Sequence, residues 1–116
     1  MSSETWYSAK LRFVVMVEPV GGNTLNDCIY LFKAVDFPAA FQRAIAIGES
    51  AQKEYRNEEG QCVLWRFKEV ISLDIIRANN LDGAEIYSEP IHLKKEEIIP
   101  FETQFRPSTS KPLQTI

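Results

Sequence analysis

Side chains alternate between apolar and polar over the segment Trp6–Glu18. Apolar residues hold every odd position from 7 to 17, and polar residues hold positions 8, 10 and 12. Period-two alternation with β-branched and aromatic enrichment is typical of a half-buried strand. Val14 and Met16 make the far end apolar on both faces, as expected where something covers the second face. We therefore predict a strand over this segment.

Two further segments extend the strand pattern. Pro19–Asp27 is rich in Gly, Asn and Asp and is predicted to be a loop that reverses the chain. Cys28–Asp36 follows as a second strand, and because it is apolar on both sides we place it centrally or at a subunit contact. Gln61–Arg77 is a third and unusually long strand, for which we expect a bend or bulge near Glu69–Ser72.

The fourth predicted strand depends on a turn signal. Asn79–Gly83 has the sequence Asn-Asn-Leu-Asp-Gly, a combination that favours a hairpin. Ala84–Ser88 is then expected to return alongside the third strand. After Pro90 the apolar residues are isolated among charged ones, and 107–116 is predicted to be a flexible tail.

One segment has helical periodicity instead. Asp36 is a good N-cap, and Pro38 is tolerated in the first turn because its missing N–H would have no intrahelical partner. The helix is predicted to run to about Asn57, where Asn-Glu-Glu-Gly forms a stop signal. Gly48 lies on the apolar stripe and indicates close approach of the backbone to the sheet. The stripe comprises Phe37, Phe41, Ala44, Ile45, Gly48, Ala51 (or Gln52) and Tyr55.

The predicted order is strand, strand, helix, strand, strand, which defines an α+β domain of ββαββ type. A helix of about 20 residues spans roughly 30 Å, and a strand of about ten residues spans roughly 33 Å. The two lengths favour one long helix packed along one face of a four-stranded antiparallel sheet. A length of 116 residues suits a single domain, which we assign to residues 1–106.

The charge and composition exclude several classes of protein. The net charge is −3, and the short basic runs lie beside acidic residues, so no nucleic-acid-binding patch is expected. We expect no membrane span, because no stretch approaches about 20 apolar residues. The N-terminus lacks the features of a signal peptide, which indicates a cytoplasmic protein. Cys28 and Cys62 fit that compartment as reduced thiols, and a disulfide would require their strands to be neighbours.

One helix is narrower than four strands, so one sheet face is expected to lack a cover. Exposed apolar patches of this kind mark interfaces. We predict a homodimer through this face or through an exposed strand edge. The alternative is that the C-terminal segment folds back over the face. The residues assigned to the dimer face are Trp6, Val14, Met16, Tyr30, Phe32 and Leu64.

The sequence contains no recognisable catalytic constellation. Gly21-Gly22 lacks the spacing of a phosphate-binding loop, and one histidine with two distant cysteines is a poor ligand supply for a metal. His92 has no evident nucleophile beside it, so a partly exposed structural role is favoured over general base catalysis. No cofactor is expected, and we predict that the protein is not an enzyme.

A small-molecule site is the main alternative to an interaction surface. Glu85 beside Tyr87, opposite Arg77 in the predicted hairpin, would form either a polar site or an ordinary cross-strand ion pair. A pocket between helix and sheet would be lined by Tyr55, Trp65, Arg66, Arg77 and Glu85.

Dispersed motifs resemble a known bacterial family. They are Trp6-Tyr7-Ser8-Ala9-Lys10, Leu31-Phe32-Lys33-Ala34-Val35-Asp36, a helix with Ala40, Ala44 and Gly48 before Tyr55, Trp65, and Glu85-Ile86-Tyr87-Ser88. Together they resemble the domain-of-unknown-function family 4288 over about residues 6 to 90. The resemblance implies a small cytoplasmic bacterial protein that acts alone or as an accessory module. It supplies no established activity and no catalytic residues.

The sequence thus favours a non-enzymatic protein-interaction or regulatory module that acts as a homodimer. The second hypothesis is a small-molecule-binding protein or enzyme with a pocket between helix and sheet. Neither the partner nor the ligand is specified by these patterns.

Overall fold

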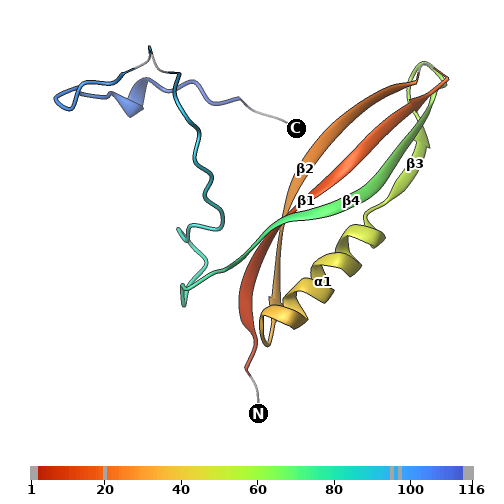
Figure 1. The fold of residues 1–116 in the computed structure, drawn as a ribbon, viewed down its shortest axis with the longest axis horizontal. Coiled ribbons are helices and arrows are strands. Elements are labelled where there is room, and N and C mark those ends of the chain that lie inside the picture. Colours follow the sequence, from red (N-terminus) through yellow and green to blue (C-terminus); the bar gives the residue numbers. More distant parts are fainter. Residues whose placement is uncertain (1–2, 20, 95, 97, 114–116) are drawn as a thin grey trace.

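A computed structural model describes residues 3–19, 21–94, 96 and 98–113. Within them the chain forms one α-helix against a curved, four-stranded antiparallel sheet (Figure 1), which confirms the predicted ββαββ order and α+β class. The strands lie in the order β2-β1-β4-β3. The elements are β1 Thr5–Glu18, β2 Gly22–Ala34, α1 Phe37–Ser50, β3 Lys53–Arg56, β4 Cys62–Ile75 and the short 3-10 turn η1 Pro107–Thr109.

The first hairpin is tighter than predicted. β2 begins at Gly22, so most of the predicted loop Pro19–Asp27 is strand, and Gly21 makes the turn with a φ of 78°. Polar, turn-favouring residues are held in the strand because β1 offers a continuous partner, with Arg12 opposite Asp27. β2 lies at the edge of the sheet, so its predicted central position is wrong.

The helix ends earlier than its predicted limit at Asn57. Its last residue is Ser50, and the next residues form β3, which pairs with the start of β4. The predicted stop signal is the turn of the β3–β4 hairpin. Asn57 Oδ1 accepts from the backbone N–H groups of Glu59 and Gln61, at 3.0 and 2.9 Å. Helix-favouring residues become a strand here because pairing with β4 outweighs local propensity.

The fourth strand is therefore β3, and the prediction of a strand at Ala84–Ser88 is wrong. The predicted turn does form, with Ala84 N–H donating to Leu81 O at 3.0 Å and Gly83 at a φ of 82°. The chain then leaves the plane of the sheet instead of pairing with β4. Beyond it, residues 114–116 of the predicted tail lie outside the described residues, and the one-domain division stays a prediction.

β4 is irregular where a bulge was expected. Its register with β1 moves from Lys10 opposite Ser72 to Leu11 opposite Val70, which leaves Ile71 as an extra residue. A second shift, between Arg12 and Phe13, leaves Lys68 unpaired in the same way. Each extra residue switches β4 between odd-numbered and even-numbered residues on the side that faces the helix. The prediction of a bulge near Glu69–Ser72 is confirmed, and the second bulge lies just before it.

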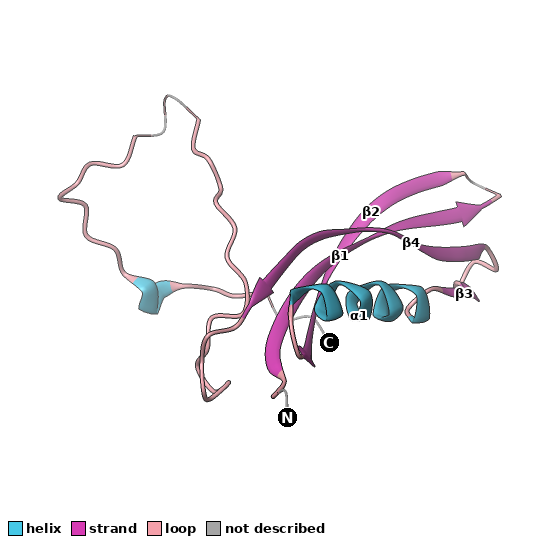
Figure 2. Ribbon diagram, turned by 60° about the horizontal axis from the view of Figure 1, so that its bottom comes forward, coloured by secondary structure: helices cyan, strands magenta, loops and turns pink. Residues whose placement is uncertain are grey.

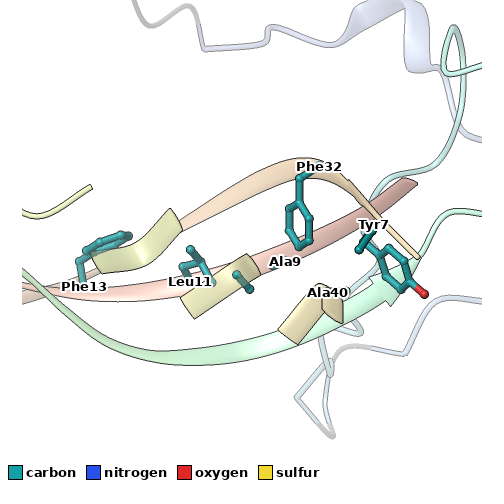
Figure 3. Packing of buried hydrophobic residues seen from close by; sticks show 8 residues of the cluster. Tyr7, Ala9, Leu11, Phe13, Phe32 and Ala40 are labelled. Atoms are coloured by element: carbon teal, nitrogen blue, oxygen red, sulfur yellow. The ribbon is translucent and has the colours of Figure 1, made fainter. Parts of the chain in front are cut away.

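The core lies between α1 and one face of the sheet (Figures 2 and 3). The odd positions 7 to 13 of β1 supply its centre, as the alternation predicted. Asp36 caps the helix as expected, with its Oδ1 accepting from Ala39 N–H at 2.9 Å. The buried helix residues are the small ones, Ala40, Ala44 and Gly48. Phe37 and Phe41, predicted on the apolar stripe, are exposed, and the small residues make the contact with the sheet instead.

Phe32 belongs to this core and not to the opposite face. It lies opposite Tyr7 across the β1–β2 pair, and its ring stacks on that of Tyr7 at 6.4 Å between centroids. Tyr30 is opposite Ala9 and also packs against the core. Their assignment to the dimer face is therefore wrong. The reason is the register, since residues directly opposite each other in a sheet share a face.

We predict that Gly48→Ala destabilises the fold. An added Cβ would lie 2.6 Å from the ring of Phe67, so a side chain would have to move. Overpacking costs about 1–3 kcal/mol, which outweighs the gain of about 1 kcal/mol in helix propensity. Urea denaturation should show a lower free energy of unfolding. In a Phe67→Ala background the same change should be neutral or stabilising, and a loss in both backgrounds would contradict this contact as the cause.

Candidate functional site

The sheet face opposite α1, which we call the open face, carries no helix formed by the described residues (Figure 2). It is formed by the even positions of β1 and the odd positions of β2. This alternation follows from the antiparallel register, because the core holds the odd positions of β1. β4 adds side chains such as Leu64 and Arg66, which lie opposite Met16 and Val14.

The middle of the open face is a charge cluster formed by Lys10, Arg12, Asp27 and Glu89. Arg12 donates to both carboxylate oxygens of Asp27, at 2.8 and 2.9 Å. Lys10 Nζ lies 3.7 Å from Asp27 Oδ2 and 3.3 Å from Glu89 Oε2. The cluster therefore pairs its cations and carboxylates with one another.

These pairings move the pKa values of Asp27 and Lys10 further from neutral pH. The hydrogen bonds from Arg12 lower the pKa of Asp27, and the partial desolvation of its carboxylate opposes this only in part. The hydrogen bond with Tyr87, at 3.1 Å, and the contacts with Glu89 raise the pKa of Lys10. A general acid or base works best with a pKa near the working pH. The cluster thus resembles a structural ion-pair network more than a catalytic one.

A return segment, Ala84–Glu89, lies over one end of the open face. The Ser8 hydroxyl donates to the backbone oxygen of Ile86, and Ser8 is only 1% exposed although it points away from the core. Tyr87 and Glu89 reach Lys10. Residues 84–89, most of which were predicted to be a strand, thus cover part of the open face, and among the described residues they leave the β2 side without such contacts.

A cavity of about 180 Å³ lies beneath the return segment. That volume is below the roughly 300–1,000 Å³ of typical ligand pockets. Its lining includes Glu85 but none of the other four residues predicted for a pocket. The lining residues are Asp74, Ile75, Ile76, Glu85, Ile86, Tyr87 and Ser88.

The five residues of the predicted ligand pocket are distributed over four places. Tyr55 and Trp65 lie near each other, since the ammonium of Lys53 is over both rings, at 5.9 and 4.5 Å from their centroids. Arg66 lies on the open face, opposite Val14. Arg77 follows β4, and Glu85 lies in the return segment. The structure therefore brings two of the five together.

The predicted dimer-face residues divide differently. Trp6, Val14, Met16 and Leu64 do lie on the open face, whereas Tyr30 and Phe32 lie on the helix side. Sequence reasoning missed the apolar residues of β2 that share the open face. Leu25, Ile29 and Leu31 are 57%, 45% and 42% exposed. Their alternation was visible, but only the register with β1 shows which face they occupy.

The two cysteines are free and lie on strands that β1 separates. Cys62 Sγ is 3.3 Å from Glu54 Oε1, across the β3–β4 hairpin. This hydrogen bond, with desolvation and the carboxylate charge, raises the pKa of the Cys62 thiol. A raised pKa opposes thiolate formation and thus a nucleophilic role.

Metal and membrane signatures are missing from the part of the chain that the structure describes. No group of three or more His, Cys, Asp or Glu side chains there is placed to hold a metal ion. No helix there is long and apolar enough to cross a membrane.

The family model for a domain of unknown function, DUF4288, matches residues 6–88. The chain belongs to the DUF4288 family. The match begins in β1 and ends in the return segment, so it contains the sheet, the helix and the cover of the open face. The resemblance seen in the sequence is confirmed. Neither the curated proteins nor the solved structures gave a match to this DUF4288 chain.

We predict that Ser8→Ala releases the return segment. The buried hydroxyl would no longer satisfy Ile86 O, a loss of about 1 kcal/mol. Hydrogen exchange should become faster in residues 84–89 than in β1. Ser72→Ala is the matched control, because the buried Ser72 hydroxyl has no hydrogen-bond partner among the described residues. That variant should leave exchange unchanged, and equal acceleration in both would contradict the assigned hydrogen bond.

A second prediction concerns the Cys62 thiol. Because the Glu54 carboxylate raises its pKa, Cys62 should be mostly protonated at pH 8 and react slowly with iodoacetamide. Glu54→Gln removes the negative charge, so the pKa should fall and the alkylation rate at pH 8 should rise. Both the wild-type and the Glu54→Gln chains would carry Cys28→Ser, so that alkylation reports on Cys62 alone. A pH–rate profile that Glu54→Gln does not shift would contradict the proposed cause.

Proposed function

We propose that this DUF4288 protein is a non-enzymatic interaction module that acts as a homodimer through the β2 side of its open face. The observation that carries the proposal is the exposure of the apolar side chains Ile29 and Leu31, with Leu25 beyond Asp27, on one face of an edge strand. Exposed apolar surface of this kind marks protein interfaces.

The rigidity of this surface supports an interface. β2 is paired with β1 along its whole length, from Ala34 opposite Thr5 to Gly22 opposite Val17. The side chains are thus presented from a fixed backbone, which lowers the entropy lost on association. The charge cluster next to Ile29 supplies polar groups of the kind that interfaces also contain.

The alternative, a small-molecule-binding protein or enzyme with a pocket between helix and sheet, has weaker support. Ala40 and Ala44 are fully buried there, and Gly48 lies directly against the Phe67 ring. A helix this close to the sheet leaves little space between them. The cavity beneath the return segment lies elsewhere and is small, and a larger hollow of about 410 Å³ is lined by the helix and Ala51 without any sheet residue.

The proposal includes a bacterial, cytoplasmic setting. The free state of both cysteines supports it, since disulfides are rare in reducing compartments. A regulatory role, in which the dimer binds a further protein, is compatible with the mild acidic charge of −3.

We predict that the protein sediments at twice 13.3 kDa at micromolar concentration. Leu31→Glu should shift it to a monomer, because a carboxylate would be buried in the apolar contact. Phe41→Glu is the control, an equally exposed apolar residue on the helix. Sedimentation equilibrium, with circular dichroism to verify folding, measures both. A dimer lost with Phe41→Glu and kept with Leu31→Glu would move the interface to the helix, and a monomeric wild type would overturn the homodimer.

A further inference from the structure

We propose that two copies of the chain join their β2 edges as antiparallel strands, with Tyr30 of one copy opposite Tyr30 of the other. The two sheets would then be continuous across a two-fold axis. This inference rests on the proposed homodimer and adds the strand, the direction and the register of the contact.

The two edges of the sheet differ in how they are protected against pairing with another strand. On one side β3 is only four residues long, and the part of β4 beyond it contains the bulges at Lys68 and Ile71. Short edge strands and bulges both hinder pairing with another chain. β2 has neither device, because its thirteen residues pair with β1 without a register shift and include no proline.

The backbone hydrogen bonds show which β2 residues face outward. Ile76 N–H donates to Trp6 O at 2.9 Å, so the backbone groups of Trp6 point toward β4. Backbone groups alternate sides along a strand, so those of Tyr7 point toward β2 and bond its partner Phe32. Ile29, Leu31 and Lys33 therefore present their N–H and C=O groups to the free edge. Antiparallel pairing of two copies must place these outward residues opposite one another.

The side chains then select one register. With Tyr30 opposite itself, Ile29 lies opposite Leu31 of the second copy, and Asp27 lies opposite Lys33 of the second copy. The two-fold axis makes each of these pairs occur twice. Shifting the axis to Ile29 or to Leu31 keeps the backbone parity but places a charged residue opposite an apolar one. Apolar and opposite-charge pairs are the favourable cross-strand combinations.

The charged partners of this register are already oriented. Two guanidinium nitrogens of Arg12 donate hydrogen bonds to the Asp27 carboxylate. The Lys33 ammonium lies over the Trp6 ring, at 4.9 Å from its centroid. Both side chains are therefore on the open face before association. A carboxylate has capacity for more than two hydrogen bonds, so Asp27 can accept from Lys33 of the second copy and keep Arg12.

Cysteine cross-linking tests the register. In the full-length chain with Cys28→Ser and Cys62→Ser, Tyr30→Cys should form a disulfide dimer under mild oxidation. Tyr30 would be in a non-hydrogen-bonded pair, in which opposite Cα atoms are about 4.5 Å apart. Asn26→Cys is the control on the same side of β2, since the two copies of position 26 would be about 27 Å apart. Non-reducing gels and intact mass spectrometry measure the product.

The outcomes separate this inference from the proposed function. A Tyr30→Cys dimer without an Asn26→Cys dimer supports the register. The register is overturned, and the homodimer is kept, if Ile29→Cys or Leu31→Cys forms the disulfide dimer in preference to Tyr30→Cys. The same holds if sedimentation shows a dimer but none of these cysteine variants forms a disulfide across it. A monomer at all concentrations overturns both. Loss of folding in Tyr30→Cys would move the test to the charge variants.

Lys33→Glu gives the second measurement. It places like charges opposite each other twice, so the dimer Kd should rise at least about tenfold. Lys53→Glu makes the same charge change at β3 on the other edge and should leave the Kd within about twofold. Equal effects of the two variants would overturn the assigned pairing.

Discussion

The fold depends on the pairing of β1 along both of its edges. β1 bonds β2 on one side and β4 on the other, and its odd positions carry Tyr7, Leu11 and Phe13 into the core. A strand at the centre of a sheet has its backbone N–H and C=O groups hydrogen-bonded to a neighbour on each edge, while one of its faces is buried. The helix packs on that face by its small residues, and Gly48 touches Phe67 of β4. Every other element is placed relative to this strand.

The same arrangement determines the open face. Because the core takes the odd positions of β1, its even positions carry charges in the middle and apolar residues toward the first hairpin. The return segment covers the end near Ser8 and contributes Tyr87 and Glu89 to the charge cluster. Among the described residues the return segment leaves the β2 side without such contacts, and this supports the proposed interaction surface.

Local signals predicted some elements well and others poorly. The alternation over Trp6–Glu18, the N-cap Asp36 and the bulge near Ile71 were all readable, because each depends on neighbours in the sequence. The helix end, β3 and the first hairpin were not, since their outcome depends on which strand is available as a partner. Turn-favouring residues at Asn23–Asp27 and helix-favouring ones at Lys53–Arg56 both became strands through pairing.

The sequence by itself determined the α+β class, the order of the three long strands and the helix, and the family. These follow from periodicity and from short motifs, which survive without knowledge of contacts. Only the tertiary structure decided which side chains share a face. One register, Tyr7 opposite Phe32, moved Phe32 and Tyr30 into the core and placed Ile29 and Leu31 on the open face. A strand that is apolar on both sides carries no local mark of its inner face, so pairing alone makes that choice.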